Sequence, residues 1–167
     1  AVSRYRDPES LRQWRRWIEE TIEWSRASRA SAVIVDKDGH TLSLYQSGRL
    51  VKTYATELGE NWTADKRRSG DSATPEGRYK VSEKKDRGRS VYYKALLIDY
   101  PNAEDRAAFA KAKARGEIPG NATPGGLIEI HGEGGRGRDW TRGCVALPNS
   151  DMDEIFAKVS VGTRVTI

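Results

Sequence analysis

The sequence contains a single cysteine, Cys144, and a histidine, His131, precedes it across a short glycine-rich stretch. A free thiol has a pKa of about 8.5, so it is mostly protonated at neutral pH and needs a base to become a nucleophile. An imidazole, with a pKa of about 6.5, suits that task. The pair could attack a carbonyl carbon and form a thioester, which is the chemistry of a cysteine acyltransferase or hydrolase.

The segments around this pair favour an exposed site. Residues 127–130 predict a buried strand that leads into His131, and residues 132–139 lack core-forming side chains and predict a surface loop. Gly143 would let backbone N–H groups approach a substrate and stabilise an oxyanion. The imidazole also needs a group that orients it, which could be Glu133, Asp139 or a backbone carbonyl. An inert buried cysteine remains the alternative.

The elements that would position the site begin with a helix and a β-meander. Asp7 and Pro8 are typical of a helix start, and apolar residues then recur at helical spacing, which predicts a helix packed on the flank of the domain. Three strands separated by turn signals follow over residues 32–56. His40 lies beside the first of these turns, and we expect it to be solvated and unimportant.

The rest of the chain predicts further strands and two more helices. Strands are expected over residues 78–83, 90–100, 127–130 and 164–167, helices over 103–115 and 150–159, and loops over 61–72 and 116–126. The second of these helices would be capped by Ser150. Strands outnumber helices, so we expect a mainly β (α+β) fold with two or three peripheral helices.

Composition narrows the function classes. The chain has 167 residues, a net charge of +5 and 37% hydrophobic residues, which favours a single domain with a true core. The basic charge suits an anionic polymer, but it equally describes an ordinary solvated surface. The run Lys66-Arg67-Arg68 is too short for a nucleic-acid patch. One Cys and two His fall short of a zinc site, so we expect neither a metal nor a cofactor.

Several motifs, in order along the chain, resemble the L,D-transpeptidase catalytic domain, the YkuD-type family. The residues that carry the resemblance are Gly70 to Tyr79, Tyr93 to Leu96, Tyr100 to Asn102, Ile130 to Gly132, Asp139 to Leu147 and Asp151 to Glu154. The resemblance covers roughly residues 32–167. We therefore expect residues 1–30 to form an N-terminal helix packed on the domain and residues 31–167 to form the catalytic domain, a β-sandwich or barrel.

The resemblance implies the roles of the site residues. Cys144 would be the nucleophile and His131 the base, oriented by the carbonyl of Gly132. The residues Gly143, Arg142, Thr141 and Trp140 would form the oxyanion and substrate-binding part of the site, with backbone N–H groups of residues 142–144 as oxyanion donors. The substrate would be the peptide stem of peptidoglycan, acylated at the L-centre of a diamino acid.

Two departures concern the second half of the reaction. The commonest motif of the family has His where this chain has Arg142, and Arg or Asn where it has Ala146. The pattern here looks more like the murein-hydrolase-like branch, some of whose members release a lipoprotein from the wall. A transpeptidase, a hydrolase (L,D-carboxypeptidase or amidase) and a catalytically silent wall-binding module all stay open.

The resemblance also implies a periplasmic or cell-envelope location, although no signal segment is present in this chain. We expect peptidoglycan stem peptides as partners, with a wall-linked lipoprotein as a further candidate, but no nucleic acid and no membrane span.

Overall fold

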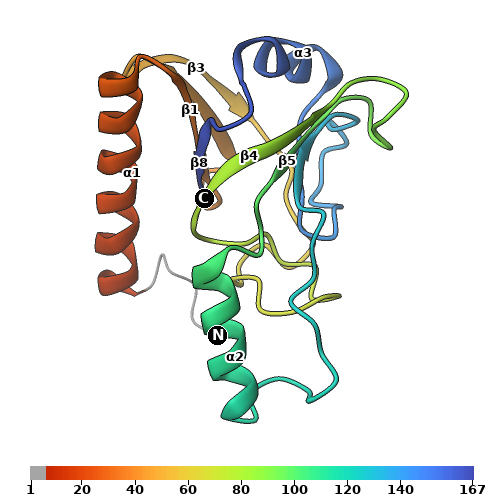
Figure 1. Cartoon of the computed structure of the whole chain (residues 1–167). Coiled ribbons are helices and arrows are strands. Elements are labelled where there is room, and N and C mark those ends of the chain that lie inside the picture. Colours follow the sequence, from red (N-terminus) through yellow and green to blue (C-terminus); the bar gives the residue numbers. More distant parts are fainter. Residues whose placement is uncertain (1–6) are drawn as a thin grey trace.

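A computed structural model describes residues 7–167 and contains one eight-stranded sheet with three helices around it. The strand order is β3-β2-β1-β8-β4-β5-β6-β7, and the sheet is strongly curled (Figure 1). The strands are β1 (Ser31–Asp36), β2 (Thr41–Gln46), β3 (Arg49–Ala55), β4 (Arg78–Lys85), β5 (Ala95–Ile98), β6 (Glu129–His131), β7 (Val145–Ala146) and β8 (Arg164–Thr166). The mainly β fold with two or three helices is confirmed.

The meander forms as its sequence pattern predicts. β1 pairs antiparallel with β2, and β2 pairs antiparallel with β3. In β2, Leu42 and Leu44 are fully buried while Ser43 between them is partly exposed, because successive side chains point to opposite faces. The enclosed core draws on most elements and includes Val33, Val35, Leu42, Leu44, Tyr79, Val81, Leu96, Ile130, Val145, Leu147, Met152, Ile155 and Val165.

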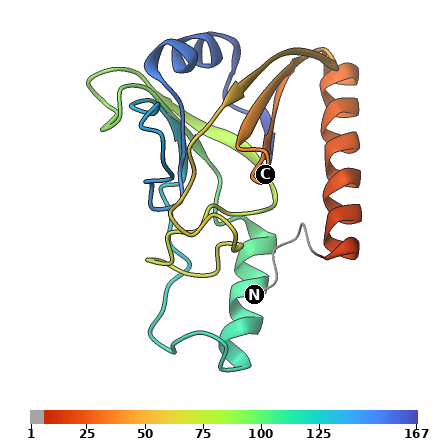
Figure 2. The same ribbon diagram turned by 180° about the vertical axis from the view of Figure 1, so that it is seen from behind.

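The helix α1 (Pro8–Ser28) begins at Asp7, whose side chain accepts a hydrogen bond from the Glu9 N–H. It lies along β1 and β8 (Figures 1 and 2), as the apolar spacing predicts. Trp14 is buried, and the Thr21 hydroxyl is 2.6 Å from the Thr166 hydroxyl of β8. The helix is thereby joined to the sheet by both apolar packing and a buried hydrogen bond.

The other two helices lie at opposite ends of the sheet (Figures 1 and 2). The helix α2 (Ala103–Ala114) starts with a capping box between Asn102 and Asp105. The helix α3 (Asn149–Lys158) starts one residue earlier than expected, and the prediction of a Ser150 cap is wrong. Pro148 occupies the cap position and supplies no side-chain acceptor.

Two predicted strands are shorter than expected. The prediction of a strand over residues 90–100 is wrong for residues 90–94, because Tyr93 has φ +73° and interrupts the extended backbone before β5. The expectation that Leu127 is buried in a strand is also wrong: its φ is +53°, and 72% of it is exposed. Within residues 7–167, none of the helices combines the length and apolarity that a membrane crossing demands.

Candidate active site

The pairing of β6 with β7 brings His131 and Cys144 to one face of the sheet. The two strands are parallel, with Ile130 opposite Val145 and His131 opposite Ala146. Ile130 and Val145 enter the core. His131 is opposite Ala146, and Cys144 directly precedes β7. The alternation of side chains along a strand therefore assigns His131 and Cys144 to the same face, away from Ile130 and Val145. A one-residue change of register would separate them.

The imidazole of His131 is buried and held in one orientation. Its Nδ1 lies 2.8 Å from the carbonyl oxygen of Gly132, so Nδ1–H donates and Nε2 is left as the basic nitrogen. The ring stacks on Tyr92 with centroids 4.5 Å apart, and Trp140 meets it in a T-shaped contact with centroids 5.7 Å apart. Burial lowers the pKa of His131 below its usual value, which keeps the ring neutral at pH 7.

Of the three groups that could orient the imidazole, the structure places the backbone carbonyl there. Asp139 is engaged elsewhere: one of its oxygens accepts from the Leu58 N–H at 2.9 Å, and the other is 2.9 Å from His40 Nε2. The His40 side chain is 31% exposed and packs edge-on against Trp62. The expectation that His40 is simply solvated is therefore wrong.

The sulfur of Cys144 is held by backbone groups. The Glu129 N–H donates to Sγ at 3.3 Å, and the thiol donates to the Leu127 carbonyl at 3.5 Å. No hydrogen bond joins the thiol to His131 among the residues that the structure describes. Although Cys144 keeps part of its surface accessible, protein atoms replace most of the water around the sulfur, and this burial raises its pKa to about 11. At neutral pH the thiol and the imidazole are therefore both uncharged.

The turn before Cys144 exposes backbone donors. Thr141 is buried; its hydroxyl donates to the Cys144 carbonyl at 2.7 Å and accepts from the Gly143 N–H at 3.2 Å. Gly143 has φ +135°, and an added Cβ would lie 2.7 Å from the Ala73 carbonyl oxygen. The N–H groups of Arg142 and Cys144 meet no acceptor within residues 7–167. Two donors therefore flank Gly143 and are available to an oxyanion.

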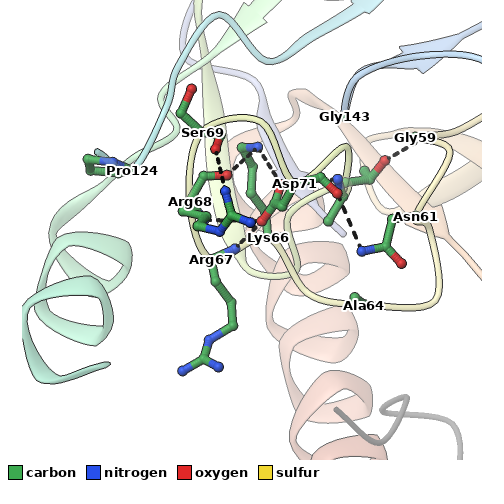
Figure 3. Close-up of polar contacts among 12 residues, drawn as sticks. Gly59, Asn61, Ala64, Lys66, Arg67, Arg68, Ser69, Asp71, Pro124 and Gly143 are labelled. Atoms are coloured by element: carbon green, nitrogen blue, oxygen red, sulfur yellow. Dashed lines mark hydrogen bonds and ion pairs between the residues drawn. The ribbon is translucent and has the colours of Figure 1, made fainter. Parts of the chain in front are cut away.

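A loop over residues 59–76 packs against this turn. Gly59 approaches it so closely that an added Cβ would lie 3.2 Å from the Gly143 Cα. Figure 3 shows how the loop is closed on itself: Lys66 Nζ lies 2.8 Å from an Asp71 oxygen, and the Asn61 amide donates to the Asp71 carbonyl. Although the sequence predicts a plain polar loop here, these bonds give it a fixed shape.

A fully buried lysine fixes the same loop to the meander. Lys37 follows β1, and its ammonium donates to the carbonyls of Ala64 and Thr74 at 2.8 and 2.6 Å. It also pairs with the Glu76 carboxylate at 3.0 Å. The Thr74 hydroxyl in turn accepts from the Gly59 N–H at 3.0 Å. A buried charge with three oxygen partners is a strong positional constraint. Lys37 therefore fixes the position of the loop that packs against Gly143.

The sequence-predicted site residues come together unevenly. Cys144, His131, Gly132, Gly143, Thr141 and Trp140 all lie in this one region. Arg142 is exposed, and its side chain has no hydrogen-bond or ionic partner within the described residues. Sequence reasoning missed Glu57, Lys37 and Tyr92, because each reaches the site through contacts distant in the sequence. Among residues 7–167 there is no cluster of His, Cys, Asp and Glu that could hold a metal ion.

Comparisons with known proteins identify the family. Residues 30–167 match the sequence profile described as the L,D-transpeptidase catalytic domain. The putative L,D-transpeptidase YafK of Escherichia coli is 32% identical over 128 residues, which is 74% of this chain and 45% of that protein. The chain thus spans about half the length of this curated relative.

Solved structures show the same fold. The helical cell shape determining protein Pgp2 of Campylobacter jejuni is 26% identical, with a TM-score of 0.61 over 82% of this chain and 46% of that one. An L,D-transpeptidase of Xylanimonas cellulosilytica, at 20% identity and a TM-score of 0.55, covers 82% of this chain and 59% of that one. Since the family profile spans most of its length, the chain belongs to the L,D-transpeptidase catalytic domain family, whose members modify peptidoglycan.

Proposed function

We propose that this chain is a cysteine-dependent peptidoglycan L,D-transpeptidase that forms an acyl-enzyme on Cys144. The observation that carries the proposal is the parallel register of β6 and β7, in which His131 lies opposite Ala146, two residues after Cys144. From this register and the alternation of side chains we infer that Cys144 faces the same side as His131. The hydrogen bond from Nδ1 to Gly132 leaves Nε2 able to accept a proton. Family membership supplies the substrate class, the stem peptides of peptidoglycan.

The residues divide the first half of the reaction between them. His131 Nε2 takes the thiol proton as Sγ attacks the carbonyl carbon on the L-centre of the diamino acid. The N–H groups of Arg142 and Cys144 stabilise the oxyanion, each worth about 2.7–4 kcal/mol by analogy with a hydrolase. The C–N bond then breaks, the imidazolium returns its proton to the leaving amine, and a thioester on Cys144 remains.

The second half decides between transfer and hydrolysis. An amine that attacks the thioester gives a new cross-link, whereas water gives a free carboxylate. Arg142 and Ala146 stand where the commoner motif has other residues, which favours the hydrolytic branch as the second candidate: an L,D-carboxypeptidase, or an amidase that releases a wall-linked lipoprotein. Both share the acyl-enzyme.

We also propose how the chain is organised and where it acts. Residues 31–167 would form the catalytic domain, and residues 1–30 would contribute the helix that packs along β1 and β8. Action on peptidoglycan places the protein in the periplasm or cell envelope. A basic surface would assist contact with the anionic wall.

Product analysis with defined muropeptides tests the proposal. Wild-type protein is incubated with a tetrapeptide donor, with and without an acceptor peptide, and the products are read by mass spectrometry. The variants Cys144→Ala and His131→Ala should keep the fold, checked by circular dichroism, and lose several orders of magnitude of rate. Cys144→Ala protein that turned over muropeptides at the wild-type rate would overturn the proposal. Wall binding without turnover by the wild type would favour a silent binding module.

A further inference from the structure

Arg136 lies flat on Trp140 beside the buried imidazole. Its guanidinium carbon is 3.5 Å from the centre of the Trp140 ring, a close cation–π stack. Its Nε–H donates to the Glu133 carbonyl at 2.9 Å. Neither contact uses the two terminal nitrogens, and no carboxylate pairs with Arg136 among the residues that the structure describes. The guanidinium of Arg136 is therefore exposed and held in one plane, with its two terminal nitrogens unpaired within the described residues, which suits it to bind a planar anion.

The surface under Arg136 is itself fixed. Trp140 Nε1 donates to one oxygen of Glu57 at 2.9 Å, and the other oxygen of Glu57 accepts the Gly137 N–H at 2.6 Å. These bonds hold the pKa of Glu57 below its usual value although burial opposes them, so the carboxylate is charged at neutral pH. Glu57 therefore fixes the position of Trp140 and strengthens the attraction of its ring for a cation. Little rotamer entropy is left for Arg136 to lose on binding.

The stack places a positive charge next to the catalytic face. The centroids of the Trp140 and His131 rings lie 5.7 Å apart, and Trp140 also contacts Tyr92, which stacks on the His131 ring. The positive charge of Arg136 contributes to the lowered pKa of His131, which is consistent with this proximity. A substrate whose scissile carbonyl reaches Cys144 would thus pass close to Arg136.

We propose that Arg136 binds a free carboxylate of the stem peptide through its terminal nitrogens and so selects carboxylate-bearing substrates over amidated ones. This inference rests on the proposed function. The ligand chemistry is a carboxylate, which could come from the diamino acid or from the C-terminus of the stem. Arg136 is then a specificity-determining residue that acts in binding and takes no part in proton transfer.

Two other arginines of the same segment provide contrast. Arg138 is exposed, and its side chain has no hydrogen-bond or ionic contact within residues 7–167, so Arg138→Ala is the matched control for loss of one positive charge. Arg142, which the resemblance assigns to the substrate-binding part of the site, is also exposed, and its side chain has no hydrogen-bond or ionic contact in that range. It is the rival position, since it would have to become ordered on binding.

The test compares Arg136→Ala, Arg136→Lys, Arg138→Ala and Arg142→Ala on three tetrapeptides. One peptide has both carboxylates free, one is amidated at the diamino acid, and one is amidated at the C-terminus. Formation of the acyl-enzyme is followed by intact mass, and kcat/KM is measured. Dissociation constants are measured by calorimetry with the Cys144→Ala protein, with and without Arg136→Ala.

Arg136→Ala should lower kcat/KM about 10- to 100-fold on the free peptide, the range expected for a charge-assisted hydrogen-bonded pair. The loss should appear in KM and in the dissociation constant, and it should vanish on the peptide whose amidation removes the bound carboxylate. Arg136→Lys should restore part of it, and Arg138→Ala should change little.

Equal losses on free and amidated peptides would overturn the inference, because they would leave Arg136 only a structural role. If Arg142→Ala lost the preference for the free peptide over the amidated one while Arg136→Ala kept it, Arg142 would be the residue that binds the carboxylate, and the inference would be wrong. Absence of any acyl-enzyme in the wild type, with every peptide, would overturn the proposed function and this inference together. Acyl-enzyme without discrimination overturns the inference alone.

Discussion

The raised pKa of Cys144 predicts how the thiol reacts with alkylating agents across pH. At pH 7 a pKa of about 11 leaves about one thiolate in ten thousand sites, whereas an ordinary thiol with a pKa of about 8.5 has about three in a hundred. Since alkylation proceeds through the thiolate, the folded site should react about 300-fold more slowly than an unfolded one on this ground alone. Cys144 is the only cysteine, so the signal has one source.

The assay is iodoacetamide labelling at pH 6–10, with the modified fraction read by intact mass. The rate should rise about tenfold per pH unit without reaching a plateau, because the whole range lies below the thiol pKa. The same chain unfolded in urea is the control, and its rate should level off above a pH of about 8.5. The shape of the profile decides the matter, since limited access to the sulfur lowers the rate at every pH alike.

A plateau between pH 7 and 9 in the folded protein would refute the reasoning. It would mean that the resting site holds a thiolate paired with a protonated His131. The raised pKa of Cys144 also makes the stability of the fold depend on pH, because a thiol whose pKa is raised on folding binds its proton more tightly in the folded state. Stability should therefore fall as the pH rises from about 8.5, the unfolded pKa, to about 11.

Three further predictions follow from particular contacts. Lys37→Met removes the buried ammonium partner of Glu76 and of two carbonyls, and it should destabilise the chain by about 3–5 kcal/mol in urea unfolding; a loss below about 1 kcal/mol would contradict the constraint. Gly143→Ala places a Cβ 2.7 Å from the Ala73 carbonyl oxygen at φ +135°, so kcat should fall about 5- to 150-fold, which corresponds to a barrier increase of about 1–3 kcal/mol, and wild-type kcat would argue against the oxyanion turn. Because burial lowers the pKa of His131, the acid limb of the pH profile of kcat/KM should have its midpoint below about 6.5. A midpoint above this value would show that a group other than His131 controls the acid limb.

Local sequence patterns predicted the elements that depend on local physics. The alternation around Leu42 and Leu44 predicted the meander, and Asp7 with Pro8 predicted the start of α1. The sequence also predicted a strand that leads into His131, and β6 ends at this residue. Failures at this level were also local: Tyr93 and Leu127 adopt positive φ values that no apolar pattern encodes.

The parts of the site that the sequence did not reveal depend on pairing between distant segments. Glu57 reaches Trp140 across a bridge between residues 57 and 146, which becomes visible only once the sheet is assembled. Lys37 lies in the turn between β1 and β2, where a lysine is usually exposed, yet tertiary packing buries it completely. His40 lies in the same turn and was expected to be solvated, but its ring is 2.9 Å from a carboxylate oxygen of Asp139, a residue far away in the sequence. Side chains that fix a site from remote segments carry no periodic signal.

The most direct measurement is the intact mass of the protein after brief exposure to a tetrapeptide stem, followed by peptide mapping of the adduct. We predict a mass increase that equals the acyl part of the donor, without its leaving D-amino acid, located on Cys144 and absent from both Cys144→Ala and His131→Ala. Turnover of the same peptide with no adduct at any trapping time, or an adduct mapped to another residue, would contradict an acyl-enzyme on Cys144.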